Sequence, residues 1–351
     1  MRAFVITGPR TASVLDVEEP SPAKGQVAVD VIRAGVCGTD VELFTGSMPY
    51  LHDGSTSYPI RIGHEWCGRV REVGPGVDRG WLGALVTGDT MIGCGRCDRC
   101  RAGRHHVCDD RLELGVRDGL PGALAERVLV PSVALRRLPE DMDPEAGALI
   151  EPAGSAVRAV RAAELSAGHR VCVWGSGTLG LLALQFALDE DAVVDVVGVR
   201  AEQLRLARDL GARETFRPEG VPDGGYDAVL DMSTAGDAPS RAVEIVDPAG
   251  RVVLVGIAEE PSPLDTRRVV LRDVTVVGIL AASAGLDRAI ELVASGRIRT
   301  SPLVSEVVGL DEVADVLGGA RPPSPAGAPK TLVDPHRDPP SPQTTRKNPV
   351  T

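Results

Sequence analysis

The middle of the chain alternates apolar strands with helices, and this alternation limits the fold more than any other feature. Strands are predicted at 170–174, 193–199, 228–232, 251–257 and 274–278, and helices at 178–188, 202–210 and 239–246. Such alternation is typical of βαβ units, whose strands lie parallel in one buried sheet. Only 3% of the 351 residues are aromatic, so aliphatic side chains must fill the core. We therefore expect an α/β domain with a doubly wound parallel sheet.

A glycine-rich turn follows the first of these strands. Its G-x-G-x-x-G pattern consists of Gly175, Ser176, Gly177, Thr178, Leu179 and Gly180, and an apolar helix comes next. Between a strand and a helix, such glycines permit a tight turn and the close approach of a pyrophosphate, which the helix N-terminus attracts. The alternative is a glycine-rich turn without a ligand. We predict a dinucleotide site here.

The end of the second strand indicates which dinucleotide would bind. An acidic residue there would hold the ribose hydroxyls of NAD, but the chain has Gly198, Val199 and Arg200. No carboxylate would repel a 2′-phosphate, and a guanidinium can pair with one through two hydrogen bonds. We favour NADP over NAD. Two alternatives stay open, that Arg200 is a solvated residue at a helix start and that Asp195 faces the ribose.

The first part of the chain has a different pattern. Short valine-rich strands at 1–7, 26–34, 67–73, 84–86 and 125–130 are separated by glycine and proline. This spacing predicts a small β-barrel or sandwich with functional loops. A helix at 285–294 and a strand at 331–333 follow the α/β part, and the Pro-rich polar end of the chain is predicted to be disordered.

Four cysteines lie within fifteen residues of one another. Cys94, Cys97, Cys100 and Cys108 have the spacing C-x2-C-x2-C-x7-C, with glycines that let the backbone fold around a point. Four thiolates can form the closed tetrahedral shell of a structural zinc. An iron–sulfur cluster and four unrelated buried thiols are the alternatives. A closed site cannot activate a substrate, so we predict that this loop is architectural.

Three further candidate ligands are dispersed along the sequence. Cys37 follows a predicted strand, His64 precedes another, and Glu151 stands before a proline where the β-rich part passes into the α/β part. A thiolate, an imidazole and a carboxylate, with water in the fourth position, would form an open catalytic zinc site. Each residue alone is weak evidence, because a lone cysteine or histidine is usually structural.

The order of these motifs resembles the zinc-dependent medium-chain alcohol dehydrogenase family. The resemblance rests on Cys37-Gly38-Thr39-Asp40, Gly63-His64-Glu65, the four-cysteine loop, Glu151-Pro152 and GSGTLG, and it covers about residues 1–335. It implies a GroES-like β-barrel catalytic domain at 1–149, completed by 284–335, and a Rossmann cofactor domain at 150–283. Residues 336–351 would be a disordered tail.

The resemblance also implies roles for individual residues. Cys37, His64 and Glu151 match the catalytic zinc ligands, and Glu65 matches a carboxylate beside the metal that can enter its shell. Thr39 matches the hydroxyl that relays the substrate proton. A glutamate as third ligand is similar to the polyol dehydrogenase branch.

The route by which the substrate proton would reach solvent differs from that of many members of the family. Glu42 stands where they have a histidine, and His52 is the remaining candidate for that role, although a polar loop position is the simpler interpretation. Two zinc ions per chain and a homo-oligomer, a dimer or tetramer, are further implications of the resemblance.

Charge and composition exclude several partners. The net charge of −11 repels nucleic acid and anionic membranes, and no run of about 18 apolar residues occurs. The N-terminus lacks the pattern of a secretion signal, so we expect a cytoplasmic protein.

The predicted activity is hydride transfer between a polyol, sugar or (amino)cyclitol and a nicotinamide cofactor. The polar residues Glu42, Ser47, Tyr50, His52, Asp53 and Glu113 favour such a polar substrate. The alternatives are a dehydrogenase of simple secondary alcohols, a zinc-binding relative without turnover, and a zinc-free reductase of activated double bonds.

Overall fold

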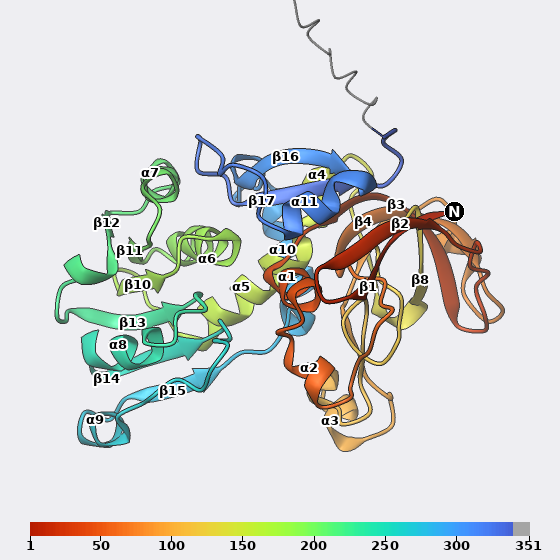
Figure 1. Cartoon of the computed structure of the whole chain (residues 1–351). Coiled ribbons are helices and arrows are strands. Elements are labelled where there is room, and N and C mark those ends of the chain that lie inside the picture. Colours follow the sequence, from red (N-terminus) through yellow and green to blue (C-terminus); the bar gives the residue numbers. More distant parts are fainter. Residues whose placement is uncertain (340–351) are drawn as a thin grey trace, which may run out of the picture.

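Two sheets in adjacent lobes organise the chain (Figure 1). The structure is a computed structural model that describes residues 1–339. The first sheet has the order β16-β17-β3-β4-β5-β9, with β8 paired to β3. Its strands are β3 (Gln26–Gly35), β4 (Glu65–Val73), β5 (Leu85–Gly88), β8 (Arg127–Pro131), β9 (Leu135–Arg137), β16 (Val304–Gly309) and β17 (Lys330–Asp334). Two small sheets, β1 (Arg2–Gly8) with β2 (Thr11–Asp16) and β6 (Met91–Ile92) with β7 (Leu112–Glu113), complete this lobe.

The sheet of the first lobe is built from both ends of the chain. Leu332 of β17 pairs with Gly35 of β3, in antiparallel orientation, so residues far apart in sequence share one sheet. β17 lies between β16 and β3 and pairs with the end of β3, where the next loop begins, which places the C-terminal segment beside the candidate ligands.

The second sheet is parallel and has the order β12-β11-β10-β13-β14-β15. Its strands are β10 (Arg170–Trp174), β11 (Val193–Val197), β12 (Glu214–Phe216), β13 (Tyr226–Asp231), β14 (Val246–Leu254) and β15 (Thr275–Gly278). All five neighbouring pairs are parallel, which confirms the predicted α/β fold with a doubly wound sheet. The strand order reverses between β10 and β13, where sheets of this type bind their ligands.

Most predicted elements of this lobe occur, with shifted ends. The helices are α5 (Ile150–Ala162), α6 (Thr178–Asp189), α7 (Ala201–Asp209), α8 (Ala238–Ile245) and α9 (Thr266–Leu271). Neither β12 nor α9 was expected, because each is short and has little apolar periodicity. After β15 the chain crosses to the first lobe through a short 3-10 turn (Ser283–Gly285) and α10 (Leu286–Ala294).

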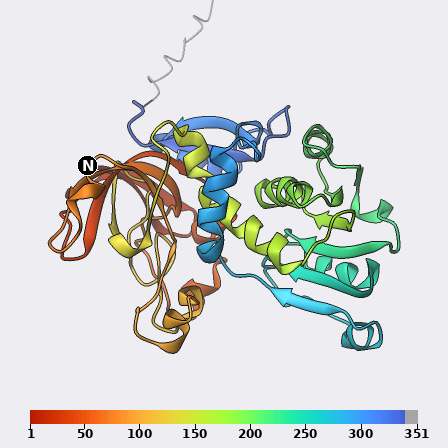
Figure 2. The same cartoon turned by 180° about the vertical axis from the view of Figure 1, so that it is seen from behind.

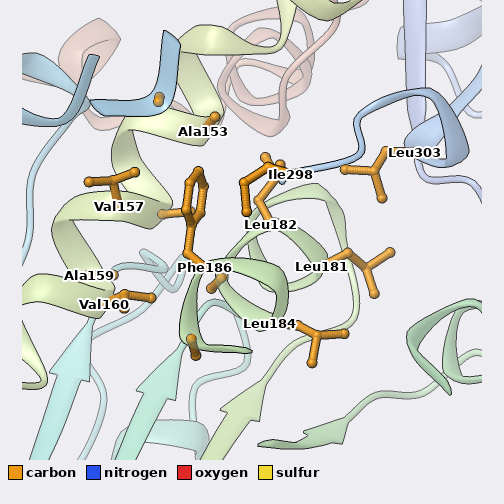
Figure 3. Close-up of a cluster of buried hydrophobic side chains, with 14 of the residues drawn as sticks. Ala153, Val157, Ala159, Val160, Leu181, Leu182, Leu184, Phe186, Ile298 and Leu303 are labelled. Carbon is orange, nitrogen blue, oxygen red and sulfur yellow. The ribbon is translucent and has the colours of Figure 1, made fainter. Parts of the chain in front are cut away.

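One apolar core spans both lobes. Helix α5 and helix α6 face each other through side chains that Figure 3 shows, among them Ala153, Val157, Leu182 and Phe186, and Ile298 from the segment after α10 packs against them. The same cluster includes Cys67 and Leu85 from the sheet of the first lobe. From behind, α10 lies against α5 (Figure 2). The two lobes are therefore joined by packing along α5 as well as by the chain.

The C-terminal boundary is only partly visible. The predicted tail begins at 336, and the ring of His336 hydrogen-bonds the Val31 carbonyl at 3.1 Å. Residues 340–351 of that predicted tail lie outside the described residues. Within residues 1–339, every helix is too short or too polar to cross a membrane.

The shared core gives a stability prediction. Leu182 is fully buried between α5 and α6, so Leu182→Ala should lower the free energy of unfolding by about 2–5 kcal/mol through lost burial and the remaining cavity. The exposed Val133, with 80% of its surface accessible, provides the control, and Val133→Ala should change stability by less than about 0.5 kcal/mol. Urea titrations followed by circular dichroism measure both, and equal effects would contradict the assignment of this core.

Candidate functional site

Three candidate ligands from different parts of the first lobe meet in space. Cys37 follows β3 and caps helix α1 (Gly38–Thr45), and His64 precedes β4, whose first residue is Glu65. Gly35 at the end of β3 lies opposite Glu65, because the two strands are antiparallel neighbours. One ligand atom from each of Cys37, His64 and Glu65 lies within 4.8 Å of the others. The group is compact enough to share one ion.

A lysine holds the carboxylate of Glu65. Lys330 on β17 donates to both carboxylate oxygens, at 2.7 and 2.9 Å, and to the Val36 carbonyl at 2.8 Å. Its side chain is 4% exposed. Sequence reasoning missed this residue, because no spacing connects position 330 with position 65. Its rarity was the one available signal, since lysine occurs elsewhere only at 24 and 347.

A buried aspartate lies beside the histidine. Asp40 accepts a hydrogen bond from the Cys37 backbone N–H at 2.9 Å, and its other oxygen lies 3.7 Å from Nδ1 of His64. Burial raises the pKa of Asp40. Burial alone would lower the pKa of His64, but the charges of Asp40 and Cys37 outweigh it and raise that pKa. A hydrogen bond from an acidic partner can fix the orientation of a ligating imidazole, and at 3.7 Å these two atoms are close to that distance without forming the bond.

Glu151 lies beside the group rather than within it. It is the second residue of α5 and is 8% exposed, but its carboxylate is not among the three ligand atoms that lie within 4.8 Å of one another. Burial raises the pKa of Glu151 to about 7, while the charge of His64 opposes that shift. The predicted role of Glu151 as a zinc ligand stays a prediction.

The donor set fits a divalent cation. Four acidic groups, Cys37, Asp40, Glu65 and Glu151, are gathered around Lys330 in the interior of the lobe. Burying such charges is costly unless a cation offsets them. In residues 1–339, Oδ1 of Asp40 and Nδ1 of His64 are also buried without a hydrogen-bond partner. Thiolate, imidazole and carboxylate are the ligands that zinc takes in proteins.

The two candidate proton carriers have different surroundings. Thr39 is partly buried in the first turn of α1, two residues from Cys37. His52 is exposed at the end of α2 (Pro49–His52), and its side chain hydrogen-bonds no described residue. Of the expected polar pocket residues, Tyr50 and Glu113 meet, with the tyrosine hydroxyl donating to the carboxylate at 3.1 Å.

The four cysteines of the loop also converge. Their sulfur atoms lie within 4.8 Å of one another, and those of Cys97 and Cys108 are 3.7 Å apart. Backbone N–H groups of Arg96 and Cys97 lower the pKa of Cys94 to about 6, whereas desolvation raises the pKa of Cys100 to about 12. The loop thus offers the four-sulfur shell that its spacing predicted.

The glycine-rich turn has the geometry that its sequence requires. Gly175 has φ +118°, and a Cβ atom there would lie 3.0 Å from the backbone of Met232. A Cβ at Gly180 would lie 1.8 Å from the Gly175 carbonyl oxygen. Gly177 caps α6, whose N-terminus therefore opens at the carboxyl end of β10. Backbone close approach of this kind is what a pyrophosphate needs.

The end of β11 carries no free carboxylate. Gly198 packs so closely on Ser176 that a Cβ atom would lie 2.7 Å from the Cβ of that serine. Asp195 is 1% exposed; Arg213 donates to its Oδ1 at 2.9 Å and the Tyr226 hydroxyl to its Oδ2 at 3.0 Å. Asp195 therefore does not face the ribose site, because its buried carboxylate is hydrogen-bonded to these two partners.

Arg200 lies at one end of a cleft between the lobes. It caps α7, is solvent-exposed, and forms no ion pair with another residue of the described chain. A cavity of about 710 Å³ extends from Arg200 and Gln203 to Cys37 and Gly38. The cavity therefore connects Arg200 of the second lobe with Cys37, one of the candidate metal ligands.

The two candidate metal sites can be tested separately. Cys100→Ser should lower the zinc content by about one ion per chain, and Cys37→Ser should remove the other ion, because each loses a thiolate ligand. Asp98→Asn in the same loop is the control, since its side chain is fully exposed. Elemental analysis of the purified variants measures the content. Unchanged zinc in Cys100→Ser would show that the four sulfurs do not hold the ion.

Comparison with known proteins agrees with this geometry. Residues 23–140 match the alcohol dehydrogenase GroES-like domain, and residues 178–295 match the zinc-binding dehydrogenase domain. The chain is 30% identical to 2-dehydro-3-deoxy-L-galactonate 5-dehydrogenase of Pseudoalteromonas atlantica, over 89% of this chain and 93% of the relative. It is 34% identical to L-threonine 3-dehydrogenase of Pyrococcus abyssi, over 76% of this chain and 79% of that one.

Solved structures show the same relationship. A zinc-binding dehydrogenase from Sinorhizobium meliloti, bound to NADP, has a TM-score of 0.86 and 31% identity, covering 95% of this chain and 99% of its own. Galactitol-1-phosphate dehydrogenase from Escherichia coli has a TM-score of 0.84 and 25% identity, covering 95% and 100%. The chain belongs to the zinc-dependent medium-chain alcohol dehydrogenase family and is an oxidoreductase that acts on CH–OH groups.

Proposed function

We propose that this enzyme interconverts a secondary hydroxyl and a carbonyl on a polar substrate, a polyol, sugar or cyclitol, with NADP as the preferred cofactor. The observation that carries the proposal is the cleft that joins Arg200 to Cys37, because it connects a phosphate-binding side chain with the candidate metal group. Relatives and structural neighbours named for a sugar acid, a diol and a sugar alcohol phosphate support a polar substrate.

Cys37 and His64 would hold the catalytic zinc together with a glutamate. Glu65 is engaged by Lys330 through both oxygens, whereas Glu151 hydrogen-bonds no described residue, so Glu151 is the better candidate for the third ligand. Zinc in this position supplies Lewis acidity, which makes a hydroxyl group easier to deprotonate. Cys94, Cys97, Cys100 and Cys108 would hold a second, structural zinc.

The chain itself would carry the proton away. Thr39 stands next to the ligand Cys37, and Glu42 lies one turn further along α1, on the same face of the helix. Burial and the nearby charge of Glu259 raise the pKa of Glu42, which makes its carboxylate a better proton acceptor. We infer that the proton passes from Thr39 toward Glu42, because His52 is exposed and has no contact that links it to the group.

The cofactor would lie along the carboxyl edge of the parallel sheet. The turn at Gly175–Gly180 would hold the pyrophosphate, and Arg200 would pair with a 2′-phosphate on the adenosine ribose. The bound nicotinamide serves as hydride acceptor or donor. Closure of the lobes over this cleft would exclude water from the reacting atoms.

The cofactor assignment makes a prediction about one side chain. Arg200→Ala should raise the KM for NADP about 10–100-fold, since a charged hydrogen bond contributes about 1.5–3 kcal/mol, and should leave the KM for NAD nearly unchanged. Arg208→Ala, an exposed change on the same helix, is the control. Initial rates with both cofactors, on a panel of polyols, aldoses, cyclitols and secondary alcohols, measure both preferences.

Two results of this panel would refute the proposal. Equal losses for NADP and NAD in Arg200→Ala would place the preference elsewhere, and faster turnover of simple secondary alcohols would remove the polar substrate. A protein that stays inactive after zinc is removed and restored would be a binding protein without turnover.

We also propose that the chain assembles into a homo-oligomer through the second lobe. Strand β15 is the open edge of the six-stranded sheet, and α9 before it exposes Val270 and Leu271, which are 76% and 83% accessible. An uncovered strand edge beside exposed aliphatic side chains favours pairing with another copy.

A single charged substitution on α9 tests the proposed interface. Leu271→Arg should lower the native mass measured by light scattering, because a cation replaces an apolar contact at the interface. Lys24→Arg, in the other lobe, should leave the mass unchanged. A monomeric wild-type chain would contradict the proposed oligomer.

A further inference from the structure

One buried carboxylate connects the four-cysteine loop with the segment that joins the lobes. Asp89, between β5 and β6, is 2% exposed. Its Oδ2 lies 2.7 Å from Nε2 of His105, which stands between the third and fourth cysteines of the loop. Its Oδ1 accepts hydrogen bonds from the hydroxyl of Ser283 and from the Met91 N–H, each at 3.0 Å. A single side chain thus joins three segments that are distant in sequence.

A second connection runs beside the first. Arg158 on α5 donates to the carbonyl oxygens of Leu280 and Ala281 and, at 3.2 Å, to Nε2 of His106 in the same loop. An unprotonated Nε2 of an imidazole accepts a hydrogen bond of this kind. The four-cysteine loop is therefore linked to the crossover twice, through Asp89 and through Arg158 on α5.

The crossover at 279–285 is closely fitted against α5. Ala281 has φ +60°, a left-handed conformation that is strained for a residue with a Cβ and persists only where its surroundings hold it. A Cβ at Gly154 would lie 2.9 Å from that of Ala282, and a Cβ at Gly285 would lie 2.0 Å from the Gly154 carbonyl oxygen. With backbones this close, displacement of the crossover also displaces the helix.

The crossover also lies at a functional position. It begins directly after β15, at the carboxyl edge of the parallel sheet, where cofactors of such sheets bind. The helix that it touches carries Glu151 in its first turn. The crossover thus lies between the edge of the sheet where the cofactor is predicted to bind and the helix that carries the predicted metal ligand Glu151.

We propose that Asp89 is a positioning residue that couples the four-cysteine loop to the crossover, so that an occupied loop and a bound cofactor stabilise each other. The inference rests on the proposed function, in which the loop holds zinc. Coupling between two binding sites is reciprocal: if the loop metal tightens cofactor binding, the cofactor must slow loss of the loop metal by a matching free energy.

The test follows the loop cysteines rather than turnover. The zinc-loaded enzyme is treated with a chelator and an alkylating agent, with and without saturating NADPH and, in parallel, NADH. Peptide mass spectrometry gives the alkylation rate of Cys94 to Cys108 separately from that of Cys37, which the cofactor could shield directly. We expect cofactor to slow alkylation of the loop cysteines at least about fivefold, within the usual range of coupling energies.

Ser283→Ala isolates the connection, because it removes one hydroxyl from the crossover and leaves the loop intact. Its loop cysteines should react at the wild-type rate without cofactor and gain less than about twofold protection with it. By reciprocity, its Kd for the cofactor should rise about fivefold. Ser295→Ala, whose hydroxyl bonds only within its own helix end, is the matched control and should behave as wild type. Asp89→Asn is a second variant that should also lose the protection.

Three outcomes would count against the proposal. Equal rates with and without cofactor in the zinc-loaded wild type would overturn the coupling alone. Full protection in Ser283→Ala and Asp89→Asn would show that these residues do not carry it. Absence of zinc from the loop in the purified enzyme would overturn the proposed structural site, and this inference with it.

Discussion

The arrangement of the first lobe depends on a buried concentration of negative charge. Asp40, Glu65 and Glu151 are buried together beside the half-buried Cys37, and Lys330 and His64 are basic side chains that the described chain places among them. Acidic groups at this depth are stable only with compensating positive charge. That requirement explains why a strand from the end of the chain pairs with β3, since it delivers the lysine to Glu65. It also explains why a divalent cation suits the site.

Helix α5 connects this charged site with the parallel sheet. Its apolar residues belong to a core shared by both lobes, Glu151 lies in its first turn, and Arg158 on its later part holds the crossover. A closely packed core transmits a displacement of one helix to its neighbours, because its buried side chains have little free space around them. The four-cysteine loop contacts the same helix through His106. Its distance along the sequence from the candidate metal group gave no indication of this contact.

Sequence reasoning predicted local geometry correctly where short-range spacing determines it. Four cysteines within one loop and glycines between a strand and a helix imply their geometry, because few backbone paths satisfy them. It missed Lys330, Asp89 and the position of Asp40 beside His64, since each lies beside a partner brought near only by folding. It also left the position of Asp195 open, because a one-residue shift in register turns a strand residue to the opposite face.

By itself, the sequence determined the fold class and the organisation of strands and helices into an α/β part and a β-rich part. Periodicity and short-range spacing carry that information, because both are properties of neighbouring residues. Only the tertiary structure decided that Lys330 occupies Glu65, that Glu151 stands apart from the compact group, and that Asp89 joins the loop to the crossover. These contacts depend on how two sheets and one shared helix pack, and a linear pattern holds no record of that packing.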